Sequence, residues 1–248
     1  MNRLGLLETD ILDADLAAEF DSYGRMFARY FDRLGGGLAY RHYQVQTGEL
    51  PRDLGECDAY LITGSRAGVY DELHWLPPLR AWLRDFHARG ARIIGICFGH
   101  QLIADTLGGR AGKSPNGWGV GVRTERIDAS RWPEHLGAPS ATLKLLYSHQ
   151  DQVLVPPPQA VSLAGSDFCP YAALAIGGNI LSFQGHPEFT PDYLRRLMAR
   201  RHELLGEACY RAALDSLDQP TDEAIVGRWL LEFIAGPETQ PTAGVAIP

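Results

Sequence analysis

One stretch of the sequence combines a nucleophilic side chain with a turn that would expose it. Residues 93–101 run Ile-Ile-Gly-Ile-Cys-Phe-Gly-His-Gln, so an apolar β-branched run, typical of a buried strand, meets Cys97 and then a helical pattern. Gly95 and Gly99 flank the cysteine at i−2 and i+2, which is the spacing of a nucleophile elbow with Cys in place of Ser. The N-terminus of a helix favours the thiolate, the reactive form. The pattern predicts a cysteine nucleophile; the alternative is a buried structural cysteine.

A second stretch, residues 180–189, supplies the residue types that a cysteine nucleophile requires. Its apolar residues predict a strand that ends at Gly185, and His186 and Glu188 follow at the exit of that strand. A histidine takes the proton of the thiol, and a carboxylate orients the imidazole. Because Cys and His are usually distant in sequence and meet in the fold, the two stretches together predict a triad of Cys97, His186 and Glu188. Alone, the His-Pro-Glu segment would indicate an exposed turn.

These two stretches resemble the signature segments of class I, triad-type glutamine amidotransferases, over about residues 4–190. GMP synthetase and the small subunit of carbamoyl-phosphate synthetase carry similar segments. A third segment, Gly-Ser-Arg-Ala-Gly-Val-Tyr-Asp at 64–71, is most similar to the stand-alone, GMP-synthetase-like branch of that family. The resemblance implies an α/β, three-layer flavodoxin-like fold with a central, mostly parallel sheet. It also implies hydrolysis of the glutamine side-chain amide to glutamate and ammonia.

The resemblance also suggests roles for residues around the triad. Backbone N–H groups of Phe98 and of the turn at Gly64 and Ser65 are expected to form an oxyanion hole. The family has a second glycine where this chain has Ser65, so we expect a strained or misplaced amide there to slow the isolated protein. Gln101 and His149 are expected to contact the substrate, the alternatives being a helix-surface position for Gln101 and a structural role for His149.

Other functions stay open at this point. The same triad could serve a γ-glutamyl peptidase or hydrolase, which differs in its leaving group. A non-catalytic regulatory or partner-binding protein could also use this fold, because fold alone does not set function. For a glutamine-specific enzyme, the ammonia would pass to a synthetase or another acceptor-binding partner protein. We expect no cofactor and no metal.

Composition favours an enzyme acting on a small molecule. The chain has 248 residues, and its formal net charge of −7 shows no nucleic-acid footprint. Because no run approaches ~20 apolar residues, we expect no membrane span. We expect one domain at residues 1–235 and a loose tail at 236–248. Four scattered cysteines without a CxxC pair fit a reducing cytoplasm, and the N-terminus lacks a signal-peptide pattern. A solvated helix face is predicted for a cluster of four arginines, Arg195, Arg196, Arg200 and Arg201.

The predicted elements would place the candidate residues at one edge of a sheet. Strand and helix patterns alternate through the first half of the chain, which predicts a parallel sheet with helices on both faces. Ligands of such sheets bind beyond the carboxyl ends of the strands, where Cys97 and Gly64 fall. Shorter runs from 117 to 184 predict antiparallel or mixed strands. The predicted strands are 4–7, 40–45, 59–63, 93–97, 120–127, 141–147, 160–164, 172–176 and 179–183, and the predicted helical segments are 23–34, 78–89 and 191–235.

A glycine-rich segment at 108–114 resembles a phosphate-binding loop, but its spacing excludes that function. The motif that ends in Gly112, Lys113 and Ser114 requires a glycine at position 107, which is Leu107 here. The segment also follows a predicted helix, whereas the motif follows a strand. We therefore expect no nucleotide site.

Overall fold

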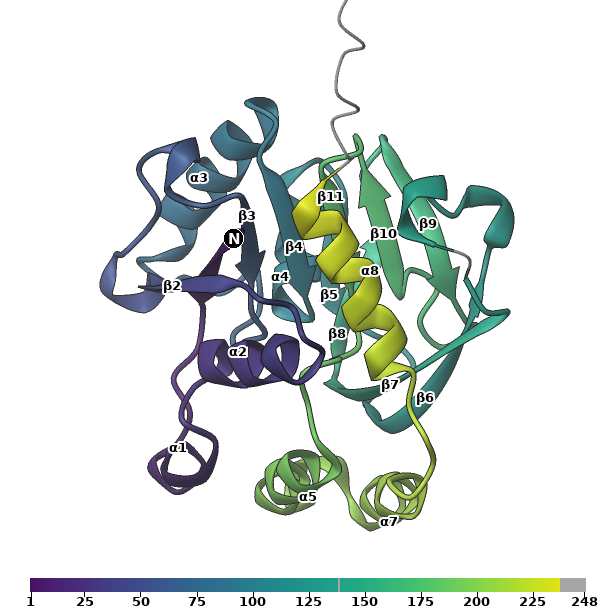
Figure 1. The fold of residues 1–248 in the computed structure, drawn as a ribbon. Coiled ribbons are helices and arrows are strands. Elements are labelled where there is room, and N and C mark those ends of the chain that lie inside the picture. The colour runs from purple at the N-terminus through teal and green to yellow at the C-terminus, as the bar shows by residue number, and fades with distance from the viewer. Residues whose placement is uncertain (138, 237–248) are drawn as a thin grey trace, which may run out of the picture.

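The computed structural model describes residues 1–137 and 139–236, which build a nine-stranded sheet covered by helices (Figure 1). The strand order is β2-β1-β3-β4-β11-β10-β9-β6-β7, parallel from β2 to β11 and antiparallel beyond. These strands are β1 (Arg3–Glu8), β2 (Ala39–Gln44), β3 (Ala59–Ile62), β4 (Arg92–Ile96), β6 (Gly119–Ile127), β7 (Thr142–His149), β9 (Ala160–Gly165), β10 (Ala173–Ile176) and β11 (Ile180–Phe183). The helices are α1 (Ala14–Phe20), α2 (Tyr23–Arg33), α3 (Leu76–Ala88), α4 (Phe98–Thr106), α5 (Pro191–Arg200), α6 (His202–Leu205), α7 (Glu207–Ser216) and α8 (Glu223–Ala235).

The parallel half of the sheet is apolar on both faces, as its β-branched and aliphatic sequence dictates. Along β4, Ile94 and Ile96 pack into a core under α2 and α8, whereas Ile93 packs into a core under α3 and α4. Figure 1 shows α8 and α2 in front of the sheet, with α3 and α4 behind it. These layers confirm the predicted three-layer α/β fold.

A third apolar cluster joins helices α1, α5 and α7, which Figure 1 shows together beyond one edge of the sheet. Leu16 of α1, Tyr193 of α5 and Ala213 of α7 are all buried in it. The hydroxyl of Thr190 accepts a hydrogen bond from the Tyr193 N–H at 3.2 Å and caps α5, which begins at Pro191, where the predicted helical segment begins.

The structure differs from the predicted elements in two regions. No strand was predicted within the glycine-rich segment at 108–114, but β5 (Arg110–Lys113) forms there and pairs with β8 (Asp151–Val155) in a separate two-stranded antiparallel sheet. The helical segment predicted at 191–235 is divided into four helices, and Gly206, at φ 73°, separates α6 from α7. Short helix α1 was not predicted.

The expected tail at 236–248 lies outside the described residues except for Gly236, and the one-domain division stays a prediction. Within the described ranges, none of the helices is both long and apolar enough to cross a membrane.

The glycines around Cys97 are required by the close approach of three backbone segments. A Cβ atom added to Gly95 would lie 2.7 Å from the carbonyl carbon of Gly99, and one added to Gly99 would collide with the carbonyl oxygen of Ile62 in β3. Backbone atoms cannot rotate away as a flexible side chain can, so helix α4 packs tightly against β3 and β4 only while these positions lack a side chain.

We therefore expect Gly99→Ala to lower the free energy of unfolding by about 1–3 kcal/mol, the usual cost of overpacking. Gly55→Ala is the matched control, because its added Cβ would have no atom within 4 Å. Urea denaturation followed by circular dichroism measures both. Equal midpoints for the two variants would contradict the steric account.

Candidate active site

Three neighbouring parallel strands end at one edge of the sheet and bring the predicted catalytic residues together. Gly64 follows β3, Cys97 follows β4 and His186 follows β11. Strand β4 pairs with both β3 and β11, and the N–H of Cys97 donates to the carbonyl of Phe183 at 2.9 Å. Segments distant in sequence therefore meet around one cysteine.

Cys97 occupies a strained backbone conformation between strand and helix. Its φ and ψ are 52° and −99°, outside the regions that non-glycine residues usually occupy, and it caps the N-terminus of α4. Such a conformation costs about 1–3 kcal/mol and recurs at active sites. The side chain lines a cavity of about 330 Å³. Nε2 of Gln184 donates to Sγ of Cys97 at 3.5 Å, a contact that the sequence analysis did not anticipate.

His186 is held between a carboxylate and the thiol. Its Nδ1 hydrogen-bonds Oε1 of Glu188 at 2.8 Å, and Cys97 lies near enough to act on the charge of the imidazole. The imidazole stacks on the ring of Phe189 with centroids 3.7 Å apart, and its backbone N–H donates to the carbonyl of Leu146 in β7 at 2.8 Å. The ring is thereby fixed in orientation.

The charges around His186 raise its pKa by more than its burial lowers it. Burial alone would lower the pKa of His186, but Glu188 and Cys97 outweigh it and raise the pKa to about 10. The arrangement therefore favours an imidazolium beside the thiol at neutral pH. An imidazolium at this position stabilises the thiolate of Cys97 and can give its proton to a leaving group.

The turn after β3 lies against the triad. A Cβ on Gly64 would be 2.9 Å from Cε1 of His186, so a larger residue would displace the imidazole. The carbonyl of Gly64 accepts a hydrogen bond from the hydroxyl of Thr9 at 3.1 Å. Because the peptide is planar and trans, the N–H of Ser65 points away from Thr9.

Ser65, which stands where the family has a glycine, does not adopt a positive φ, so its backbone lacks the left-handed strain that we expected there. In the described part of the chain, Asp21 and Cys97 are the non-glycine residues with positive φ. The hydroxyl of Ser65 donates to the carbonyl of Thr9 at 3.0 Å, which anchors the turn. Phe98 places its N–H in the first turn of α4 while its ring packs on Trp75 at 5.7 Å. The oxyanion roles of these amides stay predictions.

Gln101 and His149 both line the cavity, and both are engaged by protein groups. Nε2 of Gln101 donates to the carbonyl of Asp151 at 2.7 Å and to Oε1 of Gln184 at 3.1 Å. His149 donates from Nδ1 to the same carbonyl at 2.8 Å, and burial lowers its pKa to about 3. His149 is therefore neutral, and substrate contact by either residue stays a prediction.

Several residues of the cavity wall were not selected from the sequence. They lie in the segment after β3, on the β5–β8 sheet, just before β6 and at the junction of α5 and α6, and their positions depend on long-range packing. Arg201 was expected on a solvated helix face, but it lines the cavity and donates to the hydroxyl of Ser148 at 3.0 Å. The other such residues are Tyr70, Lys113, Trp118 and Asp151. Across residues 1–137 and 139–236, no cluster of three His, Cys, Asp or Glu side chains is arranged to hold a metal ion.

A family model described as glutamine amidotransferase class-I matches residues 17–202. The chain belongs to this family. Gamma-glutamyl peptidase 2 of Arabidopsis thaliana is 29% identical to this amidotransferase over 204 residues, which are 79% of this chain and 82% of that protein. The glutamine-hydrolyzing GMP synthase of Aeropyrum pernix is 39% identical over 118 residues, which are 47% of this chain and 22% of the synthase.

Solved structures share the fold of this amidotransferase. A glutamine amidotransferase from Thermotoga maritima superposes with a TM-score of 0.76 at 17% identity, covering 95% of this chain and 99% of that one. The family match and the peptidase and synthase relatives make the protein a cysteine hydrolase of the class I glutamine amidotransferase family, and the enzyme class expected from its sequence is confirmed.

Alkylation should distinguish Cys97 from the other cysteines. Burial raises the pKa of the Cys57 and Cys169 thiols, whereas Cys209 is the most exposed of the four. We expect brief iodoacetamide treatment near neutral pH to label Cys97 first, because its thiolate has an imidazolium beside it. Mass spectrometry of the digested protein locates the label. Faster labelling of Cys209, or unchanged selectivity in His186→Ala, would show that access alone controls the reaction.

Replacing Glu188 tests the electrostatic arrangement. In Glu188→Gln the largest force raising the His186 pKa is gone, so burial lowers that pKa and the imidazolium is lost at a lower pH. The thiolate then forms only at higher pH. We expect the pH profile of Cys97 alkylation to move upward from that of the wild type. A profile that stays in place would exclude this role of Glu188.

Proposed function

We propose that this amidotransferase hydrolyses γ-glutamyl amide bonds through a covalent thioester on Cys97. What supports this is the joint placement of a thiol on a strained elbow, a buried imidazole whose pKa the nearby Cys97 and Glu188 raise, and the carboxylate of Glu188 at 2.8 Å from Nδ1 of that imidazole. A nucleophile, its base and an orienting group in this order are the requirements of acyl transfer.

Each step uses Cys97, which lines the cavity, and groups placed around it. Sγ of Cys97 attacks the γ-carbonyl carbon, and the carbonyl oxygen becomes an oxyanion held by the N–H groups of Phe98 and Ser65. His186 gives its proton to the leaving nitrogen as the C–N bond breaks, which leaves a γ-glutamyl thioester and a free amine. Water, deprotonated by His186, then attacks the thioester; glutamate leaves and the thiolate is restored.

The α-ammonium and α-carboxylate of the glutamyl group need partners of both signs. Lys113 and Asp151 face the cavity from adjacent positions of the β5–β8 sheet. Burial raises the pKa of Asp151, so this carboxylate gains from a bound cation. We assign Asp151 to the α-ammonium and Lys113 to the α-carboxylate, with Gln101 and His149 supporting the wall between them.

We favour γ-glutamyl peptides over glutamine as the main substrate. The plant gamma-glutamyl peptidase matches most of this chain, and the cavity continues beyond Cys97 into a second one. Glutamine, with ammonia passed to a partner protein, is the second candidate, and the local identity with a GMP synthase favours it.

Release of glutamate from a panel of substrates tests this function. We expect the purified protein to cleave γ-glutamyl dipeptides faster than glutamine. Cys97→Ala should abolish release, and His186→Ala should do nearly the same, because nucleophile and base act as a unit. Glu188→Gln should keep more activity, and Cys209→Ala, a cysteine outside the cavity, should keep it all. Turnover by Cys97→Ala would refute the covalent route, and rapid use of glutamine alone would select the second candidate.

A further inference from the structure

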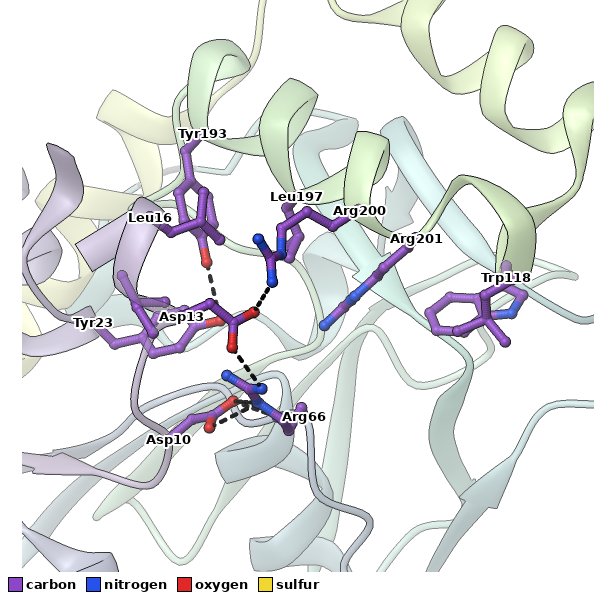
Figure 2. A pocket seen from close by; sticks show the side chains of 12 residues that line it. Asp10, Asp13, Leu16, Tyr23, Arg66, Trp118, Tyr193, Leu197, Arg200 and Arg201 are labelled. Carbon is purple, nitrogen blue, oxygen red and sulfur yellow. Dashed lines mark hydrogen bonds and ion pairs between the residues drawn. The ribbon is translucent and has the colours of Figure 1, made fainter. Parts of the chain in front are cut away.

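A second cavity, of about 580 Å³, opens beside the cavity of Cys97 (Figure 2). Its walls come from the loop after β1, helix α1, helix α5 and the start of α6. The two cavities adjoin at four residues that line both of them, and we call this junction the passage: Arg66, Trp118, Arg201 and Leu204. A molecule whose amide lies at Cys97 can therefore reach residues that also line the second cavity.

Most charges of the second cavity neutralise one another. Arg66 contacts Asp10 and Asp13, each at 3.1 Å, and Arg200 contacts Asp13 at 2.8 Å. These ion pairs cross the cavity wall in Figure 2. They bring α1, the turn after β3 and the end of α5 together, so their role is structural.

Arg201 differs from these arginines. No carboxylate of the described residues lies within 4 Å of its guanidinium, which donates to the neutral hydroxyl of Ser148 and lies 5.9 Å from the ring centroid of Trp118. Figure 2 shows its side chain extending into the cavity between the ion pairs and Trp118. An arginine with unused donors binds carboxylates well because its planar group presents two parallel N–H bonds.

Apolar side chains lie beside the guanidinium of Arg201 in the wall of the second cavity. Leu204 is 63% exposed although it is a large aliphatic residue, and it lines the passage together with the partly buried Trp118. A ligand that fits the passage therefore combines a carboxylate with an apolar group.

The second cavity and His186 share one aromatic cluster. His186 stacks on Phe189, and Phe189 packs on Tyr193 at 4.5 Å and on Tyr23 at 6.3 Å. Both tyrosines line the second cavity. The second cavity therefore lies close to the imidazole as well as to the cavity of Cys97.

We propose that the second cavity binds the amino acid released from a γ-glutamyl dipeptide. Its α-carboxylate pairs with Arg201, and its apolar side chain packs on Trp118 and Leu204. The inference rests on the proposed γ-glutamyl hydrolysis and adds a substrate class to it: peptides with a free carboxylate and an apolar residue next to the cleaved bond.

The test compares γ-glutamyl-leucine with γ-glutamyl-leucinamide, which lacks the carboxylate. For the wild type we expect kcat/KM to favour the acid by about tenfold to hundredfold, the size of a hydrogen bond to a charged group. Arg201→Gln should lose this preference. Arg195→Gln is the matched control, because Arg195 lies on α5, the helix that ends just before Arg201, is exposed and pairs with Asp192 at 2.8 Å; it should keep the preference.

The contact of Arg201 and the γ-glutamyl hydrolysis on which it rests can fail separately in this experiment. If the wild type cleaves acid and amide equally well, the Arg201 contact is refuted while γ-glutamyl hydrolysis stands, and this result needs no variant to fold. A preference that survives Arg201→Gln refutes the contact as well. If no γ-glutamyl compound is cleaved, glutamine included, the proposed function fails and the inference fails with it.

Discussion

The whole site depends on the backbone of Cys97, which turns from strand to helix within one residue. The turn needs a positive φ at the cysteine and glycines at 95 and 99, where added side chains would meet backbone atoms. Strand β4 can then end against its neighbours β3 and β11, and helix α4 can begin at once. The thiol is left facing the edge of the sheet at a helix N-terminus, where the amide and dipole geometry favours negative charge.

The charge state of His186 depends on the carboxylate beside it. A buried imidazole is normally neutral, as His149 shows in the same cavity wall, where burial lowers its pKa to about 3. His186 is equally buried, but Glu188 and Cys97 raise its pKa instead. Two histidines with similar exposure thus have opposite charge states because one has a carboxylate at hydrogen-bond distance. That difference favours His186 over His149 for the proposed acid–base role.

The sequence predicted the elbow, the partners of the triad and the parallel half of the sheet, because each depends on a local pattern of glycines and apolar runs. It did not predict the β5–β8 sheet, whose short Arg-Ala-Gly-Lys strand has weak periodicity and pairs with residues far along the chain. It also placed Arg201 with the exposed arginines of its helix. The helix ends at Arg200, so Arg201 leaves the regular helical face and reaches Ser148. Such a change of direction depends on tertiary packing.

The central claim is that a γ-glutamyl group becomes covalently attached to Cys97 during turnover. Rapid acid quenching of the enzyme mixed with a γ-glutamyl dipeptide, followed by mass spectrometry of the digested protein, tests it most directly. The account predicts a transient mass increase of one γ-glutamyl group on the peptide that contains Cys97, absent from Cys97→Ser. Steady glutamate release without any adduct on that peptide, or an adduct on a different residue, would contradict it.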